Sequence, residues 1–328
     1  MNKFTFGVMA YNQEEIVLET LNSIKYQVVH FGKEYDTQII FTDDNSSDNT
    51  VKVIETWLDT NRSLFCSVIK HWNHENLGTS SNYNFILEHI KNEPFKIIAG
   101  DDIIASNDIY RETIKLMDNE IKNYLRCYLK NEKVYIDEFA IRMHFLLLNK
   151  TIEKKKQLSR FYRGRIIHTP STLYSKSLYN ASNAKEYNSK YFLFEDNPTW
   201  YSMLINTPES ELTFCNRILV LYRISEKSVS NSDSDLNKKF VKELKTLYQE
   251  YLNTAKFLDR LYIKSKIMSF DNTRAIFYRV EDKLVNVYCK LYCDVIHRKK
   301  YIKFNEDYKK MVEIEQKYYN KEIAHEDI

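Results

Sequence analysis

Two adjacent carboxylates, Asp101 and Asp102, are the residues of this chain whose placement best suits chemistry. They follow Gly100, which lets a ligand approach the backbone closely, and the apolar run 95–99. Carboxylate oxygens are the hard ligands that Mg²⁺ and Mn²⁺ prefer, and a cation held here can share its coordination with phosphate oxygens. Because Asp is also common in solvated turns, the pair by itself does not distinguish a metal site from an ordinary loop.

A second acidic pair, Asp43 and Asp44, opens the polar segment 43–48 directly after another strand-like run. Adjacent like charges are costly unless they bind a ligand or cap the next helix. Capping by Ser47 or Asp48 explains part of this segment but not both leading carboxylates. The pattern therefore predicts a second binding element.

The elements that must position these acids alternate between strand and helix over the first hundred residues. Strand-like runs cover 4–10, 37–42, 64–70 and 95–99, and apolar positions repeat at helical spacing over 17–28, 51–58 and 80–90. This alternation predicts a parallel, doubly wound sheet. Ligands of such sheets bind beyond the carboxyl ends of the strands, so the polar segments that follow the strands are expected to meet at one edge.

The rest of the chain is less regular up to about residue 235. We expect a helix near 110–124, another over 200–205, a strand over 218–222 and helices from residue 236 onward. This pattern predicts a core domain at residues 1–230 and a C-terminal helical region at 231–328.

Composition limits the class of protein. The chain has 328 residues, of which 43% are hydrophobic and 28% charged, with only five Gly and four Pro, as expected for a globular protein with a substantial core. Its 48 basic and 45 acidic residues predict a mixed surface, so nucleic acid is not the expected partner. Five Cys without a CxxC pair indicate reduced thiols, and the lack of a leader-like or spanning apolar run predicts a cytoplasmic location.

Four motifs occur in a fixed order: Val8-Met9-Ala10-Tyr11-Asn12, the segment from Asp43 to Thr50, Asn76-Leu77-Gly78 with Asn82, and Gly100-Asp101-Asp102. In order and spacing, this series resembles the family-two, GT-A fold inverting glycosyltransferases of the bacterial polysaccharide and glycoconjugate type. The resemblance implies a Rossmann-like, mostly parallel α/β sheet followed by a C-terminal helical extension.

The resemblance also implies roles for particular residues. Asp102, together with Asp101, would bind Mn²⁺ or Mg²⁺, and the carboxylate of Asp44 suits the imide N–H of uracil. Ala99 stands where many relatives carry the first Asp of an Asp-x-Asp motif, and Ser225 stands where many carry His, so metal binding would depend mainly on Asp102. The residues expected to bind the nucleotide are Met9, Ala10, Tyr11, Asn12, Asp43, Asp44, Asn76, Gly78, Asn82 and Asp101.

Further along, Glu195-Asp196 resembles the family's Glu-Asp element at the start of a helix, which makes Asp196 the candidate general base for an acceptor hydroxyl. A helix N-cap is the simpler interpretation of the same pair. The other acceptor-side candidates are Glu195, His168, Trp200, whose ring would stack on a sugar, and Arg223, which would meet a phosphate or an acidic partner.

The implied activity is transfer of a sugar, with inversion, from a nucleoside-diphosphate sugar (a UDP-sugar as leading donor) to a hydroxyl of a glycan or lipid-linked acceptor. An inactive binding or scaffold protein of the same fold is the alternative, and a nucleotidyltransferase is a weaker one. The basic run 154–156 and the Lys- and Tyr-rich C-terminal helices suggest contact with anionic lipid at the inner face of the membrane or with a lipid-diphosphate acceptor, although a solvated helix face explains them too. The C-terminal helices also suggest a homodimer.

Overall fold

The computed structural model describes residues 2–91, 94–149, 153–224, 235–270 and 276–324. By internal contacts the chain divides into two compact units. The first unit contains Met1–Tyr135, His168–Arg223 and Lys310–Ile328, and the second contains Ile136–Ile167 and Ile224–Lys309. The expected domain boundary between residues 230 and 231 falls outside the described residues and stays a prediction.

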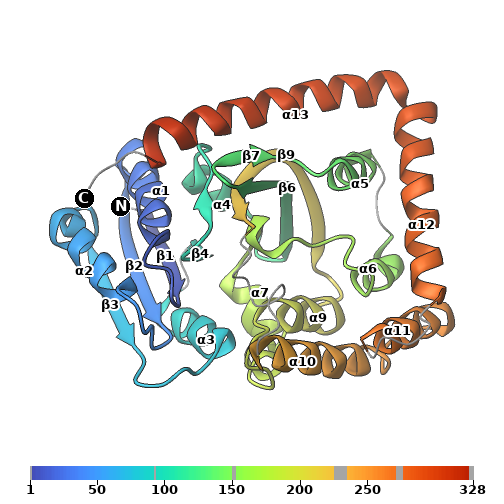
Figure 1. The fold of residues 1–328 in the computed structure, drawn as a ribbon, viewed down its shortest axis with the longest axis horizontal. Coiled ribbons are helices and arrows are strands. Elements are labelled where there is room, and N and C mark those ends of the chain that lie inside the picture. Colours follow the sequence, from blue (N-terminus) through green and yellow to red (C-terminus); the bar gives the residue numbers. More distant parts are fainter. Residues whose placement is uncertain (1, 92–93, 150–152, 225–234, 271–275, 325–328) are drawn as a thin grey trace. The chain divides into compact units, whose positions relative to one another are not determined.

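The first unit contains a four-stranded parallel sheet in the order β3-β2-β1-β4 (Figure 1). Its strands are β1 (Asn2–Ala10), β2 (Tyr35–Asp43), β3 (Ser67–Trp72) and β4 (Phe95–Ala99). The connecting helices are α1 (Val17–Phe31), α2 (Thr50–Asn61) and α3 (Thr79–His89). The predicted alternation is thereby confirmed, except that β3 begins later than expected because Arg62–Leu64 form a 3-10 turn.

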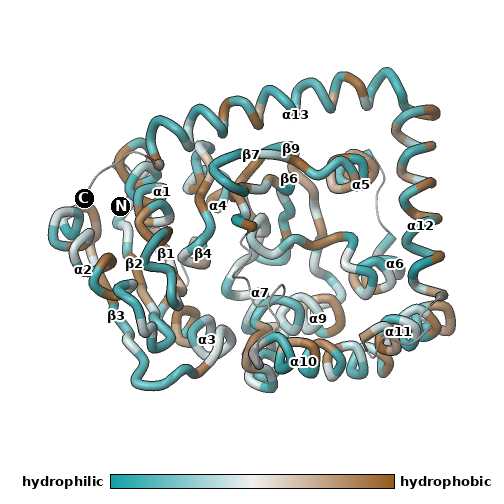
Figure 2. Tube along the Cα trace, viewed as in Figure 1, coloured by the Kyte–Doolittle hydropathy of each residue, from teal (hydrophilic) through white to brown (hydrophobic). Residues whose placement is uncertain are grey.

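Both faces of this sheet are covered, and successive residues of β1 point to opposite faces. Phe4, Phe6 and Val8 lie in one buried cluster with apolar residues of α1 and α2. Gly7 points to the opposite face, where a Cβ atom would come within 2.5 Å of Ile86 in α3. The strands therefore read as nearly continuous apolar runs, which Figure 2 shows as brown stretches of β1 and β2.

A second, mixed sheet in the first unit has the order β5-β9-β6-β7, with β8 antiparallel to β6. The strands are β5 (Ile103–Ile104), β6 (Glu120–Lys130), β7 (Lys133–Tyr135), β8 (Thr172–Tyr174) and β9 (Glu211–Arg223). The helices of this region are α4 (Ile109–Ile114), α7 (Lys176–Ala181), α8 (Ala184–Asn188) and α9 (Asp196–Asn206). Strands β6 and β9 run parallel with two register shifts.

Two expectations for this region need correction. The predicted helix over 110–124 is wrong: α4 ends at Ile114, and Tyr124 lies within β6. The turn-forming Asp118-Asn119 separates the two elements. The predicted strand over 218–222 is the last part of the longer strand β9.

The second unit is helical. It contains α5 (Glu138–Asn149), α6 (Lys154–Phe161), α10 (Asp235–Tyr251), α11 (Phe257–Ser269), α12 (Ile276–Lys290) with the π-helical turn η3 (Leu291–Ile296), and the first part of α13 (Arg298–Tyr318). The predicted C-terminal helices are thereby confirmed. Among the described helices, none combines the length and the apolar character needed to cross a membrane.

Candidate active site

The loops that follow β1 and β2 are hydrogen-bonded to each other. The amide N–H of Asn12 donates to Ser46 Oγ at 2.8 Å, and the amide N–H of Ser47 donates to Asn12 Oδ1 at 2.8 Å. Asn12 and Asn45 both have positive φ angles, 51° and 63°, which Asn tolerates better than most residues. The two predicted nucleotide-binding loops thus form one polar frame, with Tyr11 39% exposed at its edge.

The strand residues below this frame fix its position through their backbone. The carbonyl of Met9 accepts from Gly100 N at 2.8 Å, and the carbonyl of Ala10 accepts from Asp44 N at 3.0 Å. The three strand ends carrying the predicted site residues therefore lie side by side.

Asp43 and Asp44 have separate partners. Asp43 accepts from Ser46 N at 2.8 Å and from Ser46 Oγ at 2.5 Å, so it closes its own turn. Burial raises the pKa of Asp43, and these two hydrogen bonds oppose that shift. The expected conflict between adjacent charges is relieved because the two side chains bind different loops.

Asp44 orders the loop that precedes α3. Its Oδ1 accepts from Leu77 N at 2.7 Å and from Asn73 Nδ2 at 3.1 Å, and its Oδ2 accepts from Gly78 N at 2.9 Å. Asn73 also donates to Asn82 Oδ1, whose own amide donates to the Gly78 carbonyl at 2.9 Å. The predicted residues Asp44, Gly78 and Asn82 are therefore members of one network.

Two amide oxygens at this loop remain without partners. Asn73 Oδ1 and Asn76 Oδ1 are buried and accept no hydrogen bond from the described residues. Buried polar atoms of this kind ordinarily find a partner in protein, water or ligand.

Two constraints require a glycine at position 78. Its φ angle is +82°, and a Cβ atom would stand 2.2 Å from the carbonyl oxygen of Phe192. The same carbonyl accepts from Ser80 N at 3.3 Å. The loop that contains Asn76-Leu77-Gly78 is therefore packed against the segment that leads to Glu195 and Asp196.

Asp101 and Asp102 are fastened to the end of β9 by Arg223. The amide N–H of Arg223 donates to Asp102 Oδ1 at 3.0 Å, and its Nε donates to the Asp101 carbonyl at 2.8 Å. Its Nη2 pairs with Glu19. Of the two partners predicted for Arg223, the acidic one is therefore present as Glu19.

The Asp102 carboxyl lies in an environment that opposes its ionisation. The residue is 3% exposed, and burial followed by the charge of Asp101 raises its pKa well above the usual range. The nearby cations Lys96 and Arg223 act in the opposite direction. A divalent cation shared with a diphosphate would relieve this cost, and such cations commonly need only one or two protein carboxylates. Within the described parts of the chain, no group of three or more His, Cys, Asp or Glu is placed to hold a metal alone.

Asp196 is the first residue of α9, and Glu195 occupies the N-cap position without making a side-chain cap. The Asp196 Oδ2 accepts from Thr169 Oγ1 at 3.1 Å, and its Oδ1 accepts from Asn197 N at 2.5 Å. Burial raises the pKa of Asp196, while burial and the neighbouring Asp196 charge raise the pKa of Glu195 to about 7. A simple N-cap does not account for this pair.

His168 and Tyr222 join the two acidic groups. The His168 ring lies edge-on to Tyr222 at 5.6 Å, Tyr222 precedes Arg223, and His168 precedes Thr169. Burial and the charges of Arg126 and Lys96 hold the pKa of His168 well below its usual value, which favours the neutral ring. Its Nδ1 is buried without a partner among the described residues. Asp102 and Asp196 are thus linked by a short series of contacts.

The Tyr222 hydroxyl interacts electrostatically with Asp101, Asp102 and Asp196. Its pKa is raised by burial and then by the negative charges of Asp102, Asp101 and Asp196.

Trp200 does not fit its predicted role. It is 1% exposed, its indole N–H donates to Thr169 Oγ1 at 2.8 Å, and Tyr174 packs edge-on against its ring. A ring so enclosed has no open face for a sugar, and we interpret Trp200 as a support for Thr169. Ser225, which stands where many relatives carry His, lies outside the described residues.

Residues 5–182 match the family model described as Glycosyl transferase family 2. The chain belongs to glycosyl transferase family 2. It is 24% identical over 297 residues to the GalNAc(5)-diNAcBac-PP-undecaprenol beta-1,3-glucosyltransferase of Campylobacter jejuni, covering 89% of this chain and 84% of that protein. It is 25% identical over 213 residues to an uncharacterized glycosyltransferase, the MG025 homolog of Mycoplasma pneumoniae, covering 61% of this chain and 67% of that one.

Solved glycosyltransferases share the fold. S. aureus TarS 1-349 in complex with UDP-GlcNAc aligns with a TM-score of 0.56 and 14% identity, over 97% of this chain and 91% of that chain. The mannosyltransferase PcManGT of Pyrobaculum calidifontis, in complex with GDP-Man and Mn²⁺, aligns with a TM-score of 0.52 and 11% identity, over 97% and 86%. The predicted GT-A fold is confirmed. This family-2 chain spans about half, 55%, of a longer TarS structure.

Two residues of the candidate site were missed by the sequence interpretation of this family-2 enzyme. Asn73 follows β3 directly, so the strand-end rule applied to the third strand would have found it. Lys96 is a charged residue within the apolar strand β4; it is 4% exposed, and its Nζ donates to the Pro170 carbonyl at 2.7 Å. Burial lowers the pKa of Lys96 to about 8, against the attraction of Asp102.

Proposed function

We propose that the chain transfers a sugar with inversion from a nucleoside-diphosphate sugar, with a UDP-sugar as leading donor, to a hydroxyl of a glycan or lipid-linked acceptor. Surface polysaccharide or glycoconjugate assembly is the proposed setting. The names of the relatives support this choice: one acts on a PP-undecaprenol-linked acceptor, and TarS was solved with UDP-GlcNAc. The observation that carries the proposal is the series of contacts from Asp102 through Arg223, Tyr222 and His168 to Thr169 and Asp196.

The donor nucleotide is proposed to bind at the frame formed by the loops after β1, β2 and β3. A carboxylate offers about four acceptor positions, and Asp44 already uses three of them. One position on Oδ2 therefore remains for the imide N–H of a uracil. The exposed Tyr11 ring and the unpartnered Asn76 Oδ1 provide further contacts for a base or ribose.

Asp102 and Asp101 are proposed to hold Mn²⁺ or Mg²⁺ together with the donor diphosphate. Such a cation, when bound, neutralises charge that develops on the leaving diphosphate. Asp102 Oδ1 already accepts the Arg223 amide, which fixes the direction of the carboxylate. Mn²⁺ accompanies GDP-Man in the PcManGT structure, which supports the use of a divalent cation.

Asp196 is proposed to act as the general base. It takes the proton of the acceptor hydroxyl as that oxygen attacks the anomeric carbon from the face opposite the diphosphate, which inverts the anomeric configuration. The Thr169 and Asn197 hydrogen bonds favour the ionised form of Asp196. Burial and the neighbouring Asp196 charge raise the pKa of Glu195 to about 7, and the two hydrogen bonds that Asp196 accepts support Asp196 as the ionised member of the pair.

Turnover of a panel of nucleotide sugars, followed as nucleoside diphosphate release, tests the proposal. Asp196→Asn and Asp102→Asn are each expected to lower turnover by roughly 10²- to 10⁴-fold. Asp59→Asn, an exposed acid on α2, is the matched control and should leave turnover unchanged. The anomeric configuration of the product, read by NMR coupling constants, tests inversion. Unchanged turnover in both site variants, with circular dichroism showing an intact fold, would rule out the mechanism.

A non-catalytic binding or scaffold protein of the same fold is the second candidate. Two features favour it: Ala99 replaces the first Asp of the family's Asp-x-Asp motif, and the predicted metal site offers only the two carboxylates of Asp101 and Asp102 among the described residues. Calorimetry with UDP distinguishes the candidates: binding that strengthens when Mn²⁺ is added supports the enzyme, whereas no nucleotide binding supports the scaffold.

A further inference from the structure

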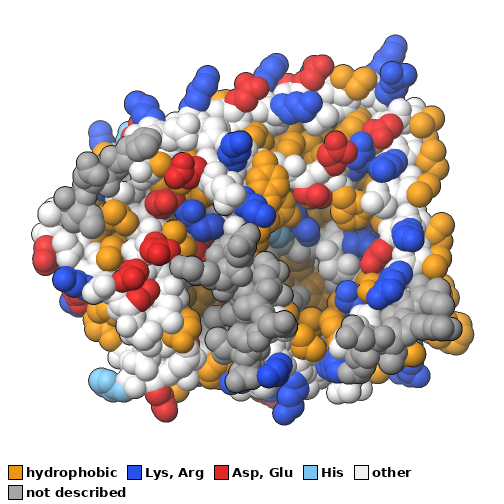
Figure 3. Space-filling view, viewed as in Figure 1, with side chains coloured by type: hydrophobic (Ala, Val, Ile, Leu, Met, Phe, Trp, Pro, Cys, Tyr) orange, Lys and Arg blue, Asp and Glu red, His pale blue; other side chains and the backbone are white. Residues whose placement is uncertain are grey.

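The second unit exposes large apolar side chains on α11, α12 and η3. Leu284 is 63% exposed and Ile296 is 65% exposed, far above the values of core residues. The exposed apolar residues of this set are Phe257, Leu258, Leu261 and Met268 on α11, Phe277, Val280, Leu284, Val287 and Tyr288 on α12, and Leu291, Val295 and Ile296 on η3. Along the edge that α12 occupies in Figure 1, Figure 3 shows hydrophobic side chains next to Lys and Arg.

Along α12 and at the start of η3, five of these side chains form one stripe. Residues 277, 280, 284, 287 and 291 are separated by three or four positions, the spacing that places residues on the same face of a helix. The opposite face is packed, because Cys289, Tyr292 and Cys293 are buried. The stripe therefore belongs to a helix that is fixed in orientation and still leaves one apolar face uncovered by the described residues.

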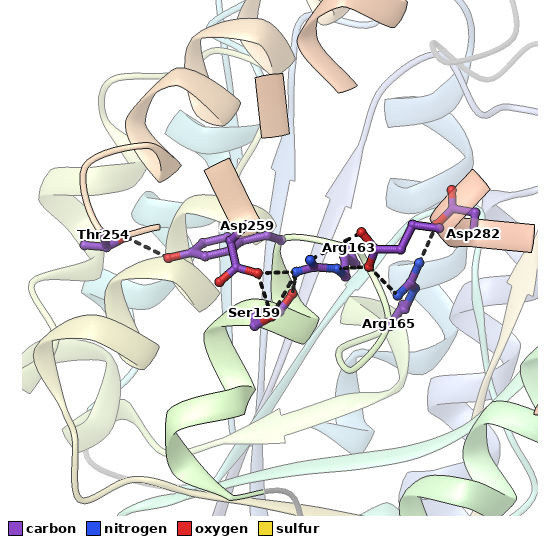
Figure 4. Close-up of polar contacts among 8 residues, drawn as sticks. Ser159, Arg163, Arg165, Thr254, Asp259 and Asp282 are labelled. Carbon is purple, nitrogen blue, oxygen red and sulfur yellow. Dashed lines mark hydrogen bonds and ion pairs between the residues drawn. The ribbon is translucent and has the colours of Figure 1, made fainter. Parts of the chain in front are cut away.

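The acidic residues of these helices are held by arginines of the unit. Arg163 pairs with Asp259 at 2.6 Å and with Glu281, and Arg165 pairs with Asp282 at 2.5 Å (Figure 4). The remaining carboxylate between residues 256 and 300 of the described chain, Asp294, pairs with Arg142 at 3.3 Å, so every described acid of this range has an arginine partner.

Cations surround the apolar stripe instead. The exposed basic residues over the same range are Lys256, Arg260, Lys264, Arg279, Lys283, Lys290, Arg298, Lys299 and Lys300. None of these nine forms an ion pair among the described residues. The surface thus combines exposed apolar side chains with unneutralised positive charge.

We propose that the surface formed by α11, α12 and η3 docks on an anionic phospholipid membrane. Amphipathic helices with basic residues beside an apolar face lie in the membrane interface, where the apolar face enters the acyl boundary and the cations meet lipid phosphates. Phe277, Leu284 and Leu291 would enter the lipid, and Lys283 and Lys290 would contact headgroups.

A second copy of the chain fits this surface less well. Two copies packed through the stripe would bring the same cations together, with no free exposed acid on these helices to pair with them. Lipid phosphates supply the missing negative charge. The proposal does not depend on the proposed sugar transfer, although a docked enzyme would meet lipid-linked acceptors in two dimensions.

Vesicle co-sedimentation of the full chain tests the docking. The wild type is expected to bind vesicles of phosphatidylglycerol and phosphatidylcholine, to bind pure phosphatidylcholine much less, and to be released at high salt. Leu284→Glu/Val287→Glu and Lys283→Glu/Lys290→Glu should each weaken binding at least about tenfold.

Matched controls carry the same charge changes on or directly after helices of the first unit. Val29→Glu/Ile114→Glu replaces exposed apolar residues, and Lys52→Glu/Lys115→Glu replaces exposed cations. Both should bind within about twofold of wild type. Equal losses in test and control variants would reduce the effect to net charge and overturn the proposal. The proposal also fails if light scattering shows a lipid-free dimer that Leu284→Glu/Val287→Glu dissociates, since the partner is then a second copy. Melting curves identify any variant that is unfolded.

Discussion

Two Asp-Asp pairs stand at equivalent places, each directly after or near the end of a parallel strand, yet their surroundings differ. The pair at 43–44 accepts five hydrogen bonds, from Ser46, Asn73, Leu77 and Gly78. The Asp102 carboxylate accepts one from the described residues, the Arg223 amide, and its pKa is raised by burial and by Asp101.

The two pairs share the Asp-Asp sequence, so the difference shows that the hydrogen-bond donors around an acidic pair decide its role. A carboxylate surrounded by N–H and O–H donors is stabilised as an anion and holds loops in place. A buried carboxylate with few donors retains a cost of ionisation that a bound cation can remove. We therefore propose that the first pair mainly orders loops, with one position of Asp44 left for the nucleotide, and that the second pair binds the cation. Four measurements test this contrast.

Gly78→Ala is expected to have the largest effect, lowering the free energy of unfolding by roughly 3 kcal/mol or more. The new methyl group would meet the Phe192 carbonyl and force a strained φ angle, which would displace the N–H that Asp44 binds. Urea unfolding measures the loss. Gly164→Ala is the matched control, because Gly164 also has positive φ (+64°) but no atom within 4 Å of its Cβ position. Equal losses in the two variants would mean that backbone strain alone is responsible.

Asp44→Asn should lower the free energy of unfolding by about 2 kcal/mol, since an NH₂ group would then face one of the N–H donors that the carboxylate now binds. Urea unfolding at neutral pH measures it, and nucleotide affinity should fall in parallel. An unchanged midpoint and slope would show that the 77–78 loop does not need this carboxylate.

Asp102→Asn should have the opposite sign and stabilise the chelator-treated protein by about 1 kcal/mol at neutral pH. A carboxyl whose pKa is raised on folding contributes stability at low pH that is lost as the pH rises through the folded pKa. The difference between wild type and variant should therefore shrink as the pH falls toward about 4. Urea unfolding across this range tests the sign, and destabilisation at neutral pH would place Asp102 with the loop-ordering acids.

Thr169→Val should have the smallest effect. It should shift the acid limb of the pH profile of kcat/KM toward higher pH by about half a pH unit. The Thr169 hydroxyl donates to Asp196 and thereby lowers the pKa of that carboxyl, so its removal leaves less ionised base at a given pH. Thr169→Ser keeps the hydroxyl and should restore the profile. A profile that does not move would argue against Asp196 as the titrating base.

The first sheet was predictable because its signals are local. Apolar runs mark β1, β2 and β4, and polar residues directly after them mark the loops, so Asn12, Asp44 and Asp102 were found without tertiary information. Contacts between distant segments were not predictable in the same way. The pairing of Arg223 with Asp102 depends on the register of β9, which shifts twice against β6, and no local pattern encodes such shifts.

The sequence separation of these contacts also affects how the chain folds as it is synthesised. The polar frame joins residues about 34 positions apart, such as Asn12 and Ser46, whereas Arg223 reaches Asp102 across 121 positions. Contacts of low sequence separation cost less chain entropy and form earlier. The loops after β1 and β2 can therefore become ordered before Arg223 fixes Asp102, and a chain stalled before β9 would retain the polar frame without a secured Asp102.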